Sequence, residues 1–199
     1  SDEVIENRSV SLQDYPFVDL ILGKEKQTKM GRGAMALEFK TFTPSMQQAL
    51  TDYCQKGGSL FISGAYVGSD LWDNPMANQT DKDFATEVLK YKWRAGQAAI
   101  EGKVKSVTSP YSVLGIQYTY YNKLNAESYV VESPDAIEPA TNEAFTILRY
   151  SENNLSAGIA YKGKYKTFVT GFPFESLRSE SERESLMKSV LDFFDSPTE

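Results

Sequence analysis

The sequence contains no histidine and a single cysteine, Cys54. Histidine is the side chain whose ordinary pKa lies near neutrality, so Ser-His-Asp and Cys-His-Glu catalytic sets and His-rich zinc sites depend on it. A chain without imidazole cannot run these mechanisms alone. One cysteine also cannot form an internal disulfide, and no cysteine spacing is typical of a zinc site. We therefore expect no metal and no other cofactor.

Basic residues are fewer than acidic ones: the sequence has 27 acidic and 21 basic residues, and its formal net charge is −6. Nucleic acids and anionic membranes are recognised through clustered basic faces, and the sequence has none. No apolar stretch is long enough to span a bilayer. We expect neither nucleic acid as a partner nor a membrane span.

The length of 199 residues and a hydrophobic content of 41% suit one globular domain, residues 1–199. The chain starts at Ser1 with no initiator methionine and no signal peptide. We interpret it as a piece cut from a larger multidomain precursor, with neighbouring domains of that precursor as partners.

The first half has the pattern of a strand, a helix and a second strand. The apolar run 17–22 ends at Gly23 and predicts a buried strand, and residues 59–63 predict another. Between them, Thr43 and Pro44 give a helix cap and a first helical position, so we expect a helix over 44–56 that ends at Gly57. This order predicts an α/β fold with a mostly parallel sheet.

The second half is rich in strands, which we interpret as an extension of the same domain. A helix is expected over 83–91, and a closing helix over 179–194. Lys162 and Gly163 are typical of a hairpin turn between the last two strands. The expected strands are 104–107, 113–121, 128–132, 145–150, 155–161 and 165–170.

The candidate site lies where two strands end. Ligands of open α/β sheets gather beyond the carboxyl ends of strands, and the sequence SGAYVGSD at 63–70 leaves its strand through glycine. Residues 171–175 leave a second strand in the same way, so the two segments are expected to approach each other, with Glu175 near Ser63 or Asp70. The candidate catalytic residues are Ser63, Tyr66, Asp70 and Glu175, and the candidate binding residues are Gly64, Gly68, Ser69, Tyr118 and Tyr120.

Each candidate has a structural alternative. No serine here has the flanking glycines of a nucleophile elbow, so segment 63–70 also reads as a tight turn capped by Ser63 and Ser69. The alternative for Glu175 is a solvated residue or a cap of the following helix, in a loop whose aromatic rings pack against the core. Tyr118 and Tyr120 suit an exposed platform for sugar stacking, or else half-buried aromatics of a strand.

Four segments resemble a known family. DLILGKEKQT at 19–28, FKTFTPSMQQALTDYCQKGGSLFISGAYVGSDL at 39–71, FATEVLKYKW at 84–93 and FVTGFPFESLRSESERESLMKSVLDFF at 168–194 resemble the class I glutamine amidotransferase-like domain of large secreted Bacteroidetes proteins, the xanthan lyase-like and golvesin-related group. The resemblance implies a flavodoxin-like three-layer sandwich and a secreted, periplasmic or cell-envelope location. It also implies a degenerate active site, because SGAYVG occupies the position of the catalytic cysteine. Related proteins have a strand before the first residues seen here, so this piece is expected to lack one sheet strand.

Three functional hypotheses follow. The first is a non-catalytic domain of a secreted or envelope protein, serving assembly or polysaccharide contact. The second is a polysaccharide lyase or hydrolase that uses the histidine-free residues at the strand exits. The third is a sugar-binding module working through the tyrosines of 118–121. The state of the crevice beyond residues 63–70, open or filled by Tyr66, Trp72 and Phe172, discriminates between them.

Overall fold

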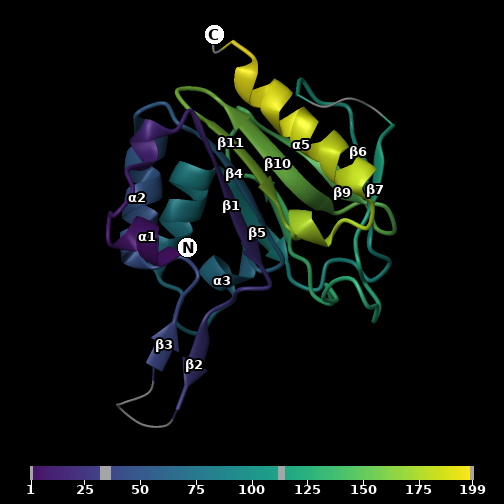
Figure 1. Cartoon of the computed structure of the whole chain (residues 1–199), viewed down its shortest axis with the longest axis horizontal. Helices are drawn as coiled ribbons and strands as arrows, with labels where there is room; N and C mark the ends of the chain where they lie inside the picture. Colours follow the sequence, from purple (N-terminus) through teal and green to yellow (C-terminus); the bar gives the residue numbers. More distant parts are fainter. Residues whose placement is uncertain (1, 32–36, 112–114, 198–199) are drawn as a thin grey trace.

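A computed structural model describes residues 2–31, 37–111 and 115–197. Its centre is a seven-stranded sheet with the order β1-β4-β11-β10-β9-β6-β7 (Figure 1). In that order the strands are β1 (Phe17–Gly23), β4 (Ser59–Gly64), β11 (Lys166–Thr170), β10 (Ser156–Lys162), β9 (Ala144–Tyr150), β6 (Lys103–Ser106) and β7 (Gln117–Thr119).

The sheet is mixed, and the prediction of a mostly parallel, flavodoxin-like sandwich is wrong. The two pairings of β4, with β1 and with β11, are parallel, whereas the four pairings from β11 across to β7 are antiparallel. A parallel neighbour requires a long crossover connection, while an antiparallel neighbour can follow a short turn. β10 and β11 are joined in this second way, since Lys162 pairs with Lys166 across the turn.

The predicted strand, helix and strand unit is confirmed. β1 lies parallel to β4, with Phe17 opposite Ser59 and Ile21 opposite Ser63, and helix α2 (Pro44–Gln55) connects them. The Thr43 hydroxyl accepts a hydrogen bond from the Met46 amide at 3.2 Å and caps α2. A hairpin of β2 (Thr28–Met30) and β3 (Leu37–Phe39) precedes α2 and projects from the body of the molecule (Figure 1).

Helices cover both faces of the sheet (Figure 1). Leu60, Ile62 and Val169 belong to the core cluster shared with α2, and Phe61 and Phe168 belong to the cluster shared with α5 (Glu180–Asp195). Side chains of a strand alternate between faces, so these two clusters are the two sides of β4 and β11. The remaining helical segments are α1 (Asp2–Glu6), η1 (Leu12–Asp14), α3 (Ser69–Trp72), α4 (Gln79–Asp83), the π-helical turn η3 (Phe84–Leu89) and η4 (Phe174–Ser176).

The second half differs from the prediction in three places. Residues 128–132 form no strand, and β8 (Ala136–Pro139) instead pairs with β5 (Tyr91–Ala95) in a separate two-stranded sheet. The helix expected over 83–91 begins earlier, at α4, and ends at Leu89, because Lys90 takes a left-handed φ of 68°. In the strand expected over 113–121, β7 is short, and positions 113 and 114 lie outside the described residues.

The other predictions for this half are confirmed. β6, β9, β10 and β11 lie at their predicted positions to within one residue, as does α5, which is capped by Ser179 and Glu182. Within the described residues, no helix is both long and apolar enough to cross a membrane.

Candidate functional site

The two predicted loops meet at one edge of the sheet. Because β1, β4 and β11 run parallel, their carboxyl ends share that edge. Gly23 is opposite Gly64, and Ser63 is opposite Thr170. Segments 63–70 and 171–175 therefore leave the sheet side by side, as the sequence predicts.

A buried carboxylate that the sequence did not indicate, Asp135, joins the two loops. Its Oδ2 atom accepts hydrogen bonds from the Gly68 amide at 2.8 Å and the Ser69 amide at 2.6 Å, and its own amide donates to the Gly171 carbonyl at 2.8 Å. The indole Nε1 of Trp93 donates to Oδ1 at 3.3 Å. Asp135 is completely buried. We interpret it as the residue that fixes the positions of both loops.

The electrostatics of Asp135 reflect this position. Burial raises the pKa of its carboxyl to about 7, and the amides of Ser69 and Gly68 act in the opposite direction because they favour the charged form. The only sequence signal was an acid directly before the apolar residues Ala136 and Ile137. Its amide partners lie 66 and 67 residues away, a relation that local pattern does not encode.

Ser63, the candidate nucleophile, is closed to solvent. It has no exposed surface, and among the described residues its hydroxyl has no hydrogen-bond partner. A serine hydroxyl needs an adjacent base to become a nucleophile. The neighbouring Gly64 is a point of close backbone approach, because a Cβ there would lie 3.0 Å from the Cβ of Leu22.

Asp70 and Tyr66 hold the chain that leads to the hairpin. Asp70 is buried, and its Oδ1 accepts a hydrogen bond from the Gln27 amide at 2.5 Å. Burial raises the pKa of its carboxyl. The half-buried ring of Tyr66 lies 5.0 Å from the Lys26 ammonium. Both contacts connect segment 63–70 to residues 26–27, so they serve the local structure.

The crevice beyond the strand ends is filled by aromatic rings. A Cβ on Gly68 would lie 2.7 Å from Cδ1 of Trp93, so this indole occupies the space in front of the loop. Phe172 is fully buried and stacks on Tyr120 at 5.5 Å between ring centroids. Tyr66 and Trp72 are half-buried against the two core clusters. The three rings named in the sequence analysis therefore pack against the core at this edge of the sheet.

The tyrosines proposed as a sugar platform do not form one. Tyr118 is 2% exposed and Tyr120 is 0% exposed. Both rings are part of the core under α5, so neither offers a face for stacking. The structural alternative, aromatics packed on a strand, is the correct one for these two residues.

Glu175 lies at the carboxyl edge, and its charged neighbour is Asp19 of β1. The Tyr129 hydroxyl donates a hydrogen bond to its Oε1 atom, and a Cβ on Gly23 would lie 3.1 Å from that atom. Its Oε2 atom is buried without a hydrogen bond among the described residues. Although Asp19 is exposed as a residue, partial burial of its carboxyl and then the charge of Glu175 raise its pKa to about 6.

Other hollows lie away from this edge. One of about 500 Å³ lies between α2 and the α4–η3 segment and includes Gln47, Asp81 and Phe84. Asp81 is already saturated there by Lys40 at 2.6 Å and by Gln47 at 2.7 Å. Over the described part of the chain, no group of three or more His, Cys, Asp or Glu side chains is arranged to hold a metal ion.

Comparison with known proteins adds similarity of structure only. No protein-family model matches the chain, and no curated protein matches it. One similar solved structure is the exo-β-1,4-mannosidase Op5Man5 from Opitutaceae bacterium strain TAV5, with 9% identity and a TM-score of 0.47, covering 93% of this chain and 25% of that one. Another, described as the mmIFT52 N-terminal domain, has 14% identity and a TM-score of 0.48, covering 99% of this chain and 83% of that one. Both TM-scores are below 0.5, so neither similarity bears on what this chain does.

Proposed function

We propose that this chain is a non-catalytic domain of a secreted or envelope protein, and that it serves assembly by contacting neighbouring domains or polysaccharide. The secreted setting rests on the resemblance of segments such as 39–71 to the amidotransferase-like group. The absence of catalysis rests on the burial of Ser63, which no substrate reaches without displacing core residues.

The chemistry of the strand exits supports the same conclusion. Acyl transfer requires a nucleophile, a base and donors aimed at the developing oxyanion. Among the described residues no base is bonded to the Ser63 hydroxyl, and the amides of Gly68 and Ser69, which would be the natural donors, are already bonded to Asp135. The two amides that would stabilise an oxyanion are used to hold the loops together.

The test is a turnover assay of the purified chain on glutamine, p-nitrophenyl esters and polysaccharides. We expect no turnover above that of a heat-denatured sample. Ser63→Ala and Glu175→Gln serve as controls. Measurable turnover that either substitution abolishes would overturn the proposal.

One observation favours a second candidate, a histidine-free hydrolase or lyase. Asp19 and Glu175 form a carboxylate pair at the surface, with the pKa of Asp19 raised to about 6 and the Tyr129 hydroxyl bonded to Glu175. Glycoside hydrolysis uses two carboxyl groups of which one carries a proton. In the same assay, polysaccharide cleavage that disappears in both Asp19→Asn and Glu175→Gln, and persists in Ser63→Ala, would support this candidate over the first.

A further inference from the structure

β1 forms a free edge of the main sheet. It is the first strand in the sheet order, and within the described residues it pairs with β4 alone. In that part of the chain, no hydrogen bond from outside this pair reaches the main chain of residues 17–21. An unpaired strand of this kind presents a row of amide and carbonyl groups to which a further strand can add.

The face of β1 on the α5 side is apolar and uncovered. Phe17 is 44% exposed and Ile21 is 50% exposed, whereas the alternate residues Val18 and Leu20 pack into the core beside α2. The Phe17 ring lies 6.3 Å from that of Phe194, which places this face beside α5.

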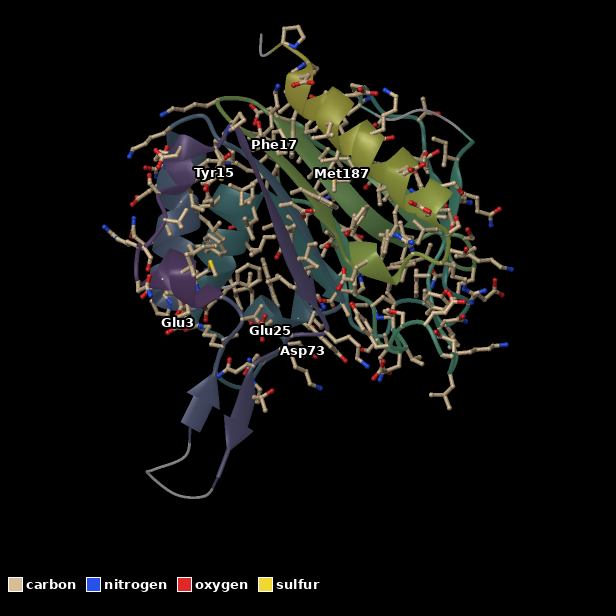
Figure 2. The ribbon with its side chains drawn as sticks, in the orientation of Figure 1. Glu3, Tyr15, Phe17, Glu25, Asp73 and Met187 are labelled. Carbon is tan, nitrogen blue, oxygen red and sulfur yellow. The ribbon has the colours of Figure 1, made fainter. Side chains whose placement is uncertain are left out.

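The uncovered strip continues on α5. A hollow of about 730 Å³ there includes the half-buried side chains of Phe174, Met187 and Leu191. Phe174 packs edge-to-face on Phe61, the residue opposite Asp19. Figure 2 shows Phe17 on β1 and Met187 on the neighbouring helix.

A negative charge stands in the middle of this strip. Asp19 lies between Phe17 and Ile21 on the same face, and the charge of Glu175 acts on it. No ion pair to Asp19 is present among the described residues. An unpaired acid on an edge strand disfavours indiscriminate pairing. It also disfavours a second copy of this chain, because antiparallel pairing of β1 with itself about Asp19 would place two Asp19 carboxylates opposite each other in an apolar contact.

We propose that β1 binds an extended segment of another polypeptide, which adds to this edge as a strand and places a lysine or arginine opposite Asp19 between two apolar side chains. The free main chain supplies the hydrogen bonds, Phe17 and Ile21 supply the apolar contacts, and the acid selects the partner by charge. The inference rests on the proposed function as an assembly domain and names the chemistry of the partner.

The test uses two synthetic seven-residue peptides with blocked ends. In the first, valine, lysine and valine occupy alternate positions separated by threonines, and in the second, glutamate replaces the lysine. We expect the full chain to bind the lysine peptide and Asp19→Lys to bind it about tenfold more weakly, the equivalent of losing one charge pair. We also expect Asp19→Lys to prefer the glutamate peptide.

Three controls make the result specific. Asp73→Lys introduces the same charge change at an exposed acid outside the strip, the C-cap residue of α3, and should leave binding unchanged (Figure 2). A lysine peptide with N-methylated main-chain amides should not bind, because it cannot pair with the strand. Hydrogen exchange should slow at residues 17–22 when the unmodified peptide is added. Asp19→Asn, which removes the charge without reversing it, separates an effect on folding from an effect on binding.

Two outcomes would overturn the inference. One is the absence of binding at millimolar peptide, and the other is binding that is equal in the wild type and in Asp19→Lys. Neither outcome depends on the turnover assay. Failure of the peptide to bind β1 is therefore distinguishable from failure of the proposal that the domain is non-catalytic.

Discussion

Two buried tyrosines in the same core cluster should respond differently to loss of the hydroxyl. Tyr150 and Tyr120 are both 0% exposed. The Tyr150 hydroxyl donates to the Asp135 carbonyl at 2.7 Å, whereas the Tyr120 hydroxyl is buried without a hydrogen-bond partner among the described residues. In Tyr150→Phe the Asp135 carbonyl loses this donor and remains buried.

The expected magnitudes follow from that difference. Leaving a buried acceptor unsatisfied costs about 1–3 kcal/mol, so Tyr150→Phe should lower the free energy of unfolding by about 2 kcal/mol, or the midpoint temperature by about 4–8 °C. Removing a hydroxyl that is buried without a partner relieves a desolvation cost, so Tyr120→Phe should be neutral or stabilising by about 1 kcal/mol. Urea unfolding followed by circular dichroism measures both. A Tyr120→Phe variant that loses as much stability as Tyr150→Phe would refute the reasoning.

Two further predictions concern the Asp135 loop. The pKa of Asp135 is raised from 3.8 to about 7 in the folded chain, so the folded chain binds this proton more tightly than the unfolded chain does. Proton binding therefore contributes its full free energy of stabilisation below about pH 4, and this contribution is lost as the pH rises towards about 7. The urea concentration at the midpoint of unfolding should therefore fall with rising pH in the wild type relative to that of Asp135→Asn. The same dependence on pH in both proteins would contradict the raised pKa of Asp135. Gly68→Ala places a Cβ 2.7 Å from Cδ1 of Trp93 and should cost about 1–3 kcal/mol. In the matched variant Gly96→Ala, the new Cβ would lie 3.7 Å from Asp135 Oδ1, so the free energy of unfolding should change by less than about 0.5 kcal/mol. If both variants lose the same free energy of unfolding, the Trp93 indole is free to move away from the new Cβ.

The sequence predicted the elements whose signals are local. The cap at Thr43, the apolar run 17–22 and the capping pair Ser179 and Glu182 each depend on residues within one or two turns of chain. Local propensity and period therefore located β1, α2 and α5. The meeting of segments 63–70 and 171–175 was also predictable, because parallel neighbours share an edge.

What the sequence did not predict depends on distant partners. The direction of each strand in the second half depends on which strand it pairs with, and an apolar run does not show whether that neighbour is parallel or antiparallel. The prediction of a mostly parallel sheet failed for this reason. Asp135 is bonded to amides 66 and 67 residues away, and Trp93 reaches Gly68 from the separate sheet formed by β5 and β8. Tyr118 alternates with polar neighbours as an exposed strand residue would, and only the position of α5 shows that it is buried. These are tertiary relations with no local signature.

The measurement that tests the central claim most directly is thiol labelling of Ser63→Cys under native conditions. The natural Cys54 is 0% exposed, and burial raises the pKa of its thiol to about 12, so it provides an unreactive internal reference. Ile21→Cys is the matched positive control, because Ile21 lies opposite Ser63 on the neighbouring strand and is 50% exposed. If the end of β4 is closed to solvent, the thiol of Ile21→Cys should be modified rapidly. The thiol of Ser63→Cys should then be modified only at the rate of global unfolding. Labelling of Ser63→Cys as fast as that of Ile21→Cys, with Cys54 still protected, would mean an open crevice and would contradict the non-catalytic account.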